Sequence, residues 1–188
     1  MSKINIDLVH EAEDFVKQLL ADKLPESIKF HNIEHAKYVS ENAALIGSNC
    51  GLNADEINLV RLSAWFHDIS YMDNPQNHEE KSAEIAAGFL SSKGVDDKII
   101  DQVKNCILAT KIPQQPKDIL SKVVCDADMA HLAADDYFER IEKMREEWES
   151  TQNRKISKRK FHKRSEKFFQ QHEYFTDFAK KEFQTKNQ

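Results

Sequence analysis

The chain has 188 residues, of which 40% are hydrophobic and 31% are charged, and its formal net charge is −5. This composition is typical of one globular domain with a single hydrophobic core, and it excludes a largely disordered chain. No run of about 18 or more apolar residues occurs, which excludes a membrane-spanning helix, and the acidic balance argues against sequence-specific or broad binding of nucleic acid.

Only four glycines and four prolines occur in the chain. Strands and hairpins need such residues at their turns, so their scarcity favours helices joined by short connections. Apolar residues recur at intervals of three and four almost throughout, which is the helical period. We therefore expect an all-α protein, a compact single-domain bundle of about seven helices.

Turn and capping residues suggest where these helices begin and end. Gly51 and Gly94 are stop signals, and Asp96 is expected to be an N-cap. A loop with two prolines precedes the short apolar run 119–125, after which a long charged helix is expected to begin. The expected helices, in chain order, cover about residues 5–23, 33–48, 55–71, 78–92, 97–108, 126–150 and 157–183.

The three cysteines, Cys50, Cys106 and Cys125, form no CxxC pair and are odd in number. Reduced, buried thiols are the simplest interpretation of such a set. No apolar signal segment follows the N-terminus. We therefore expect a cytoplasmic protein.

Two short clusters join histidine with a second polar group. His31 and His35 are four residues apart, so on a helix both rings lie on one face and can address one pocket. His67 and Asp68 lie side by side within an apolar stretch, where an unpaired carboxylate would be costly to bury. A metal ion is one of the few partners that satisfies both an imidazole and a carboxylate.

A third cluster places Asp126 and Asp128 directly after the apolar run, where a helix is expected to begin. Taken singly, each cluster has an ordinary interpretation: a helix cap, a solvated histidine pair, or a buried hydrogen bond between histidine and aspartate. Together they make a mixed nitrogen and oxygen site. Such a site suits Mn, Fe, Co, Ni, Zn or Mg without selecting strongly among them.

The order His…His-Asp…Asp, with its flanking residues, resembles the HD-domain superfamily of metal-dependent phosphohydrolases. Residues 30–36, Phe-His-Asn-Ile-Glu-His-Ala, are similar to the opening motif that this superfamily shares with the cyclic-nucleotide phosphodiesterases. Residues 65–69, Trp-Phe-His-Asp-Ile, resemble the His-Asp signature, and residues 125–129, Cys-Asp-Ala-Asp-Met, resemble the late Asp motif. The resemblance implies one HD-type domain over residues 1–188, with core motifs at 29–133 and C-terminal helices at 134–188 packed on them.

The resemblance also implies which residues bind one divalent metal ion: His35, His67, Asp68 and Asp128. Asp126 is the alternative for the last place, and Asp128 is preferred because it matches the family's Ala-Asp-apolar pattern. His31 occupies the position of the proton donor in the related phosphodiesterases, which makes it a candidate general acid. Its alternative role is to orient His35.

These residue types suit the hydrolysis of a phosphate ester or anhydride. A divalent metal ion neutralises the phosphoryl oxygens and lowers the pKa of a bound water toward neutrality. Four protein ligands leave one or two coordination positions open for that water and the substrate. Asp68 could also polarise the water, and a protonated histidine could supply the leaving group with a proton.

Residues 78–84 resemble a stretch found in several branches of the superfamily. His78 is a second-metal ligand, a substrate contact or a surface histidine, Glu79 could assist the attacking water, and Lys81 could contact a phosphate oxygen. The ordinary interpretation of the two charged residues is a solvated first helical turn. No further histidine occurs between residues 79 and 130, so one metal ion is expected rather than two. His131, three residues after Asp128, could contact substrate or hydrogen-bond to a ligand.

A basic run between Arg154 and Arg164 stands out in the acidic chain. It could attract polyanionic substrates, nucleic acid or a partner protein, or it could be a solvated helix start. Phenylalanines along 157–183 are expected to pack the last helix onto the bundle. The same aromatic helix could serve a homodimer.

These observations predict a metal-dependent phosphohydrolase that acts on a small phosphorylated molecule, with nucleotides as the favoured substrate class. Two other classes fit parts of the pattern. A non-catalytic metal- and nucleotide-binding regulatory module would bind nucleotide without turnover. A structural helical interaction protein would not respond to chelation.

Overall fold

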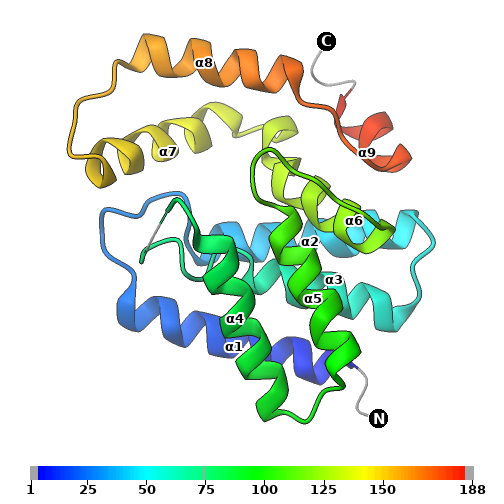
Figure 1. Cartoon of the computed structure of the whole chain (residues 1–188). Helices are drawn as coiled ribbons and strands as arrows, with labels where there is room; N and C mark the ends of the chain where they lie inside the picture. Colours follow the sequence, from blue (N-terminus) through cyan, green and yellow to red (C-terminus); the bar gives the residue numbers. More distant parts are fainter. Residues whose placement is uncertain (1–3, 74, 185–188) are drawn as a thin grey trace.

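The computed structural model describes residues 4–73 and 75–184, and these residues form an all-helical protein without strands (Figure 1). One 3₁₀ turn, η1, lies between the sixth and seventh α-helices. In chain order, the elements are α1 (Ile6–Lys23), α2 (Ile33–Asn49), α3 (Ala54–Phe66), α4 (His78–Ser92), α5 (Asp97–Ala109), α6 (Ile119–Met129), η1 (Ala130–Ala133), α7 (Tyr137–Thr151), α8 (Lys158–Gln171) and α9 (Asp177–Glu182).

Helix α3 is the centre of the hydrophobic core, because it packs against α1, α2, α4, α5 and α6. The last five residues of α3, from Leu62 to Phe66, are all buried. A helix that is surrounded by others buries every face instead of one stripe. The C-terminal end of α3, where His67 and Asp68 follow, therefore lies inside the protein.

The sequence signals for helix ends are confirmed at several places. Gly51 and Gly94, which follow α2 and α4, have φ angles of 77° and 69°. These positive values favour glycine, which lacks the Cβ that would clash. The carboxylate of Asp96 accepts a hydrogen bond from the N–H group of Lys98 and caps α5, as predicted.

Two bounds near the expected site differ from the prediction. Helix α3 ends at Phe66 instead of continuing through residue 71, and residues 67–73 form tight turns. Helix α6 begins at Ile119, because Asp118 and Ser121 form a capping box there. Consequently, Asp126 and Asp128 lie in the last turns of a helix, not at the start of one as expected.

The expected last helix at 157–183 is two helices, α8 and α9. The break between α8 and α9 has a physical cause, which is a contact with a buried residue of α6. The buried carboxylate of Asp126 accepts hydrogen bonds from the N–H groups of Phe175 and Thr176, both at 2.8 Å, and so holds residues 175–176 outside any helix. This break and the separate helix α6 give nine α-helices in the described residues instead of about seven.

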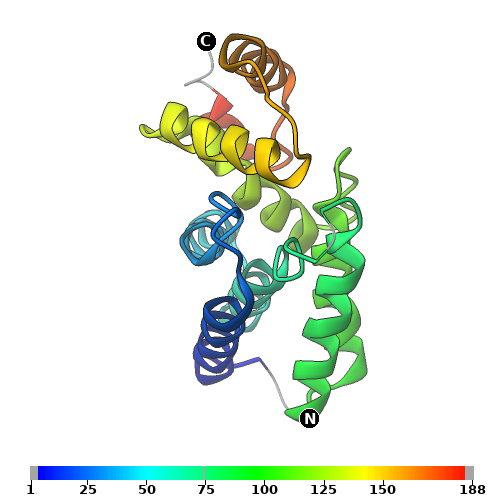
Figure 2. The same ribbon diagram turned by 90° about the vertical axis from the view of Figure 1, so that its left-hand side faces the viewer.

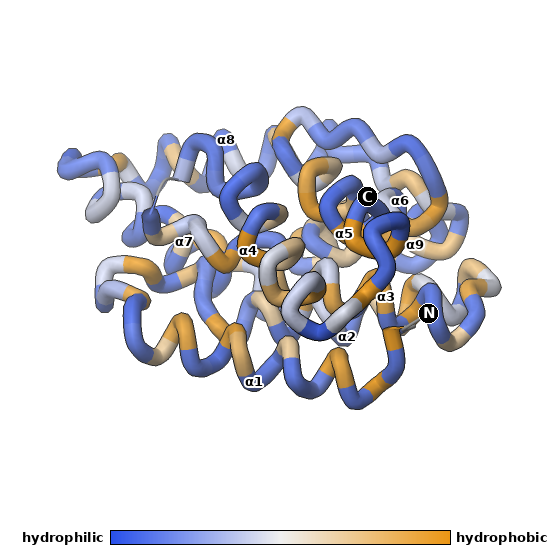
Figure 3. Tube along the Cα trace, turned by 60° about the horizontal axis from the view of Figure 1, so that its bottom comes forward, coloured by the Kyte–Doolittle hydropathy of each residue, from blue (hydrophilic) through white to orange (hydrophobic). Residues whose placement is uncertain are grey.

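The last three helices form a group at one end of the molecule (Figures 1 and 2). Helix α7 contacts η1 and α8, and α9 contacts α2. Helix α8 is mostly hydrophilic along its length, whereas hydrophobic and hydrophilic residues alternate along α1 (Figure 3). Within the described residues, no helix has both the length and the apolar character that crossing a membrane requires.

Candidate metal centre and pocket

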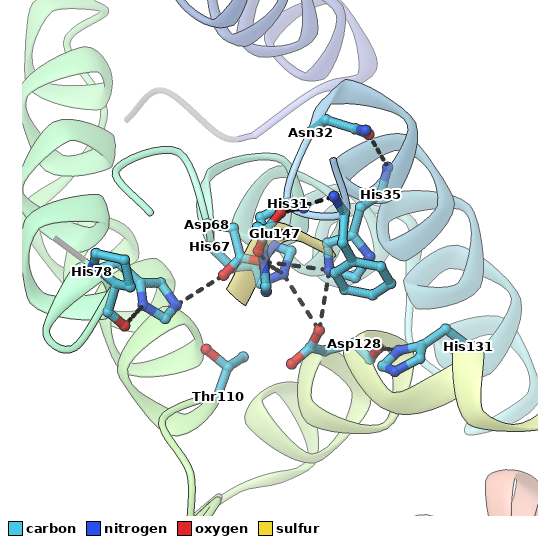
Figure 4. Close-up of polar contacts among 12 residues, drawn as sticks. His31, Asn32, His35, His67, Asp68, His78, Thr110, Asp128, His131 and Glu147 are labelled. Atoms are coloured by element: carbon cyan, nitrogen blue, oxygen red, sulfur yellow. Dashed lines mark hydrogen bonds and ion pairs between the residues drawn. The ribbon is translucent and has the colours of Figure 1, made fainter. Parts of the chain in front are cut away.

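Three parts of the fold bring two imidazoles and two carboxylates together (Figure 4). His35 lies in the first turn of α2, His67 and Asp68 directly follow α3, and Asp128 lies in the last turn of α6. The Nε2 atom of His35 lies 3.3 Å from Asp68 Oδ2 and 3.4 Å from Asp128 Oδ1. The Nε2 atom of His67 lies 3.0 Å and 3.5 Å from the same two oxygens.

These distances fit a divalent metal ion between the four atoms. For metal–ligand bonds of about 2.1 Å, neighbouring ligands lie about 3.0 Å apart at a right angle and about 3.4 Å apart at the tetrahedral angle. The Nε2 atoms of His35 and His67 are buried and make no hydrogen bond. Because buried polar atoms normally have a partner, both are available as ligands. The cluster is therefore able to hold a metal ion.

The electrostatics of the cluster also favour a cation. Burial by itself raises the pKa of Asp68 and Asp128, but the imidazoles of His35 and His67 hold both below their ordinary values. Conversely, burial lowers the pKa of the two imidazoles, and the carboxylates outweigh this effect and raise both. Both aspartates are therefore ionised at neutral pH, and their negative charge favours a cation between them.

Three histidines of the site share one arrangement that aims Nε2 away from the backbone. A carbonyl oxygen can only accept, so Nδ1 must carry the hydrogen in each of these bonds. In a neutral ring, as for His67 and His131, Nε2 is then the free acceptor or ligand atom, whereas Nε2 of His78 also carries a hydrogen when it binds the carboxylate of Asp68. The Nδ1–H groups donate to three backbone carbonyl oxygens: that of His67 to Ala64 at 2.7 Å, that of His78 to Pro75 at 3.0 Å and that of His131 to Asp128 at 2.8 Å.

His31 lies next to the cluster, just before α2. Its Nε2 atom is 4.0 Å from Asp68 Oδ2, and its Nδ1 atom is hydrogen-bonded to the carboxylate of Glu147 from α7. The ring stacks on Tyr71, with 3.6 Å between the centroids and 15° between the planes. His31 is thus held on two sides with Nε2 facing the cluster.

His78 and Glu79 begin α4 on the opposite side of Asp68. The Nε2 atom of His78 lies 3.0 Å from Asp68 Oδ1 and 3.6 Å from Glu79 Oε1. Burial by itself lowers the pKa of His78, but its hydrogen bond to Asp68 raises it overall. The side chain of Glu79 is buried, and its Oε2 atom has no hydrogen-bond partner. This oxygen is free to accept a proton or a water molecule.

The other two predicted substrate contacts differ in position. His131 is buried in η1 and lines the pocket beside the cluster, and burial and the nearby His35 lower its pKa to about 4. Lys81 does not line the pocket; its ammonium group lies 3.6 Å from Glu84 on the exposed face of α4. Lys111, after α5, lines the pocket instead and pairs with Glu80 at 2.6 Å.

A cavity of about 930 Å³ opens beside the cluster. Its polar side includes His31, Asp68, His78, Glu79 and Asp128. Its opposite side is formed by α7 and α8, which contribute mainly large apolar side chains and one arginine: Ile141, Met144, Trp148, Phe161, Phe168 and Arg164. A cavity of this size and lining is typical of a site for a small molecule.

Asp126, the alternative ligand, does not face the cluster. Its two oxygens accept the hydrogen bonds from residues 175 and 176, and its pKa is raised by burial. Reasoning from the sequence also missed Tyr71, Lys111 and Glu147. No local motif marks Glu147, which lies in a charged helix with Glu146 and Glu149 as neighbours.

Comparison with protein families matches residues 32–134 to the HD domain. A protein from an uncultured Thermotogales bacterium, described as a predicted HD superfamily hydrolase, is 20% identical, with a TM-score of 0.66 over 94% of this chain and 83% of its own. A protein from Lactobacillus plantarum is 18% identical, with a TM-score of 0.73 over 98% and 92%. Bacillus subtilis YpgQ, solved in complex with ADP, is 17% identical, with a TM-score of 0.66 over 98% and 89%. No curated protein matches the chain significantly.

Proposed function

The chain belongs to the HD domain family, as its motifs predicted, and we propose that it is a metal-dependent phosphohydrolase that cleaves a phosphate ester or anhydride of a nucleotide. One observation carries the proposal: the cluster of His35, His67, Asp68 and Asp128 lies at the side of a cavity of about 930 Å³. A buried site that served only to stabilise the fold would not need a cavity beside its ligands.

We assign His35, His67, Asp68 and Asp128 as the ligands of one divalent metal ion. When bound, such an ion neutralises phosphoryl oxygens and lowers the pKa of a water molecule. Two imidazoles and two carboxylates suit Mn, Fe, Co, Ni, Zn or Mg. His78 Nε2 and the cluster engage different oxygens of Asp68, so His78 orients this carboxylate.

The residues around the cluster divide the proton transfers between them. Glu79 has a buried, unpartnered oxygen at the pocket, which suits it to accept a proton from the attacking water. Asp68 could polarise the same water. His31 faces the cluster from the other side, and its Nε2 atom can give a proton to the leaving oxygen. His131 contributes a neutral ring to the pocket wall.

Nucleotides are the favoured substrate class for two reasons. The likeness to YpgQ, which was solved with ADP, comes from a protein of the same fold. The pocket also combines cations, Lys111 and Arg164, with the apolar wall of α7 and α8. Phosphates and a base require these two kinds of surface. Lys111 takes the role that the sequence suggested for Lys81.

We further propose that residues 134–188 belong to the same domain as the core motifs, because α7 and α8 line the pocket that begins at the cluster.

The three cysteines are free thiols, which is typical of a reducing compartment such as the cytoplasm.

The test is product release from a panel of nucleoside mono-, di- and triphosphates and cyclic nucleotides with added Mn²⁺. Turnover by the intact protein should disappear in Asp68→Ala and persist in Asp73→Ala, since Asp73 is exposed and lies five residues further along. The product identifies the cleaved bond. Tight nucleotide binding without turnover under any divalent metal would instead support the regulatory binding module.

A further inference from the structure

Glu147 is a fully buried carboxylate on α7 that serves one short segment of the chain. Its Oε2 atom accepts hydrogen bonds from three successive backbone N–H groups, those of Lys29 at 3.0 Å, Phe30 at 2.8 Å and His31 at 3.0 Å. Its Oε1 atom is hydrogen-bonded to Nδ1 of His31. All four bonds connect α7 to residues that lie more than a hundred positions earlier.

This geometry settles how the imidazole of His31 is oriented. The charge of Glu147 is retained, because the hydrogen bonds from the His31 side chain and the backbone lower its pKa, although burial by itself would raise it. An ionised carboxylate only accepts hydrogen bonds, so Nδ1 of His31 carries a hydrogen. The Nε2 atom then faces the cluster, 4.0 Å from Asp68 Oδ2 (Figure 4).

We propose that Glu147 is the positioning residue for His31 as proton donor, an inference that rests on the proposed phosphohydrolase function. The carboxylate fixes the backbone and the ring together, because one oxygen binds three backbone N–H groups and the other binds Nδ1 of the ring. His31 and Glu147 both lie outside the segment 32–134 that matches the HD domain. The C-terminal helices of this chain therefore complete the proton-donating side of the site.

The proton transfer is balanced within these groups. As water forms its bond to phosphorus, it gives a proton to Glu79; the bond to the leaving oxygen breaks, and the proton on Nε2 of His31 passes to that oxygen. The ring of His31 becomes neutral, and its Nδ1–H group remains hydrogen-bonded to Glu147. Glu147 itself stays ionised, as an orienting carboxylate should. The ring regains its Nε2 proton from solvent before the next turnover.

Leaving-group dependence tests this role, because 4-nitrophenolate leaves without a proton and phenolate benefits from one. We would measure kcat and KM with Mn²⁺ for the 4-nitrophenyl and phenyl esters of a nucleoside 5′-phosphate. Glu147→Gln should lower kcat for the phenyl ester by roughly 100-fold and for the nitrophenyl ester by less than about threefold, with KM little changed. The control Glu146→Gln removes the neighbouring charge, which pairs with Lys29, and should leave both rates unchanged.

A double-mutant cycle separates positioning from general structural damage. If Glu147 acts through His31, then Glu147→Gln causes no further loss of kcat in a His31→Ala background. Losses that multiply, or equal losses on both esters, would overturn the inference. A wild-type protein that cleaves neither ester nor any nucleotide of the panel refutes the proposed function, and the catalytic role with it.

A measurement on the wild-type protein needs neither turnover nor a folded variant. Nitrogen-15 NMR of the histidine rings at alkaline pH reports which nitrogen keeps its hydrogen. We expect His31 of the wild-type protein to keep it on Nδ1, because the carboxylate of Glu147 accepts the hydrogen bond there. A wild-type ring that keeps the hydrogen on Nε2 would contradict the inference even if the enzyme is active.

Discussion

Asp126 and Asp128 are two residues apart on α6, and this small separation decides their different roles. Two positions on a helix are separated by about 200° around the axis, so their side chains point to nearly opposite sides. Asp128 faces the cluster, whereas Asp126 faces the C-terminal segment. Both carboxylates are largely or fully buried, so exposure does not distinguish them, but their partners do.

Replacing each of these aspartates with asparagine should produce separable effects. Asp128→Asn removes an anionic ligand and should lower the affinity for Mn²⁺ by at least roughly tenfold. Asp126→Asn turns an amide N–H toward a backbone N–H and should lower the free energy of unfolding by about 1–3 kcal/mol, with the Mn²⁺ affinity retained. Calorimetric titration and denaturant unfolding measure the two effects. A loss of Mn²⁺ affinity in Asp126→Asn equal to that in Asp128→Asn would contradict the assignment.

His131 predicts a dependence of stability on pH in the metal-free protein. Burial and His35 lower its pKa to about 4 from the ordinary 6.5, so between these values the unfolded chain binds a proton that the folded chain does not. Stability should therefore decrease as pH falls from about 6.5 to 4, by about 3 kcal/mol for this group. Below pH 4, His131 should cause no further loss.

The measurement is urea unfolding across this pH range for wild type and His131→Asn, whose amide can replace the Nδ1–H donor. The variant should lose less stability between pH 6.5 and 4, whereas His10→Gln, at an exposed position, should follow the wild-type curve. Parallel curves for wild type and His131→Asn would show that this ring is not held neutral by burial.

At the scale of the element, the N-terminus of α2 shows how a cap contributes to a site. The side chain of Asn32 accepts hydrogen bonds from the N–H groups of Glu34 and His35, at 2.9 Å and 3.3 Å. The cap thereby fixes the backbone of His35, a residue of the His/Asp cluster. Asn53 caps α3 in the same way, through a capping box with Glu56, but this end of α3 is far in sequence from the cluster residues that follow its other end.

Asn32→Ala and Asn53→Ala are therefore a matched pair. Each removes one helix cap and should lower the free energy of unfolding by about 1 kcal/mol. Only Asn32→Ala should also weaken Mn²⁺ binding, because only that cap holds the turn that carries His35. Equal Mn²⁺ affinities in the two variants would mean that the cap stabilises α2 without positioning the ligand.

Helix boundaries with a local signal could be predicted from the sequence better than boundaries set by packing between distant segments. The cap at Asp96 and the glycines after α2 and α4 act through neighbouring residues, and such signals can be read locally. The end of α3 and the break between α8 and α9 depend on packing and on contacts between distant segments. The hydrogen bonds from residues 175 and 176 to Asp126 are an example, since no periodicity near residue 175 announces them.

The same distinction holds for the candidate site. The four cluster residues lie in short motifs with a known order, so the sequence could suggest them together. Glu147 and Lys111 belong to the candidate site through contacts with residues far along the chain; Glu147 contacts His31 over a separation of 116 positions. Lys81 shows the reverse case: it is close to His78 in the sequence, but it lies outside the lining of the pocket, and its position on α4 turns it toward solvent.

At the scale of the whole molecule, the pocket lies between two groups of helices with different chemistry. The core helices and the residues that follow them contribute the His/Asp cluster and Lys111, and α7 and α8 contribute an apolar wall with one cationic residue, Arg164. The chain as a whole is acidic, whereas the cations at the pocket provide local positive charge, and this charge favours a phosphorylated ligand. Of the charged residues in the basic run between residues 154 and 164, Arg164 lines this cavity.

Arg164 should therefore affect substrate binding more than its neighbours in the run. Arg164→Ala should raise KM for the best nucleotide of the panel by roughly tenfold, the equivalent of about 1.4 kcal/mol, with little change in Mn²⁺ affinity. Arg159→Ala is the control, because it removes the same charge from an exposed position on α8 that does not line the pocket. If binding depended only on the total charge of the run, the two variants would raise KM equally. A difference confined to Arg164 would show that the wall formed by α8 contacts the phosphates directly.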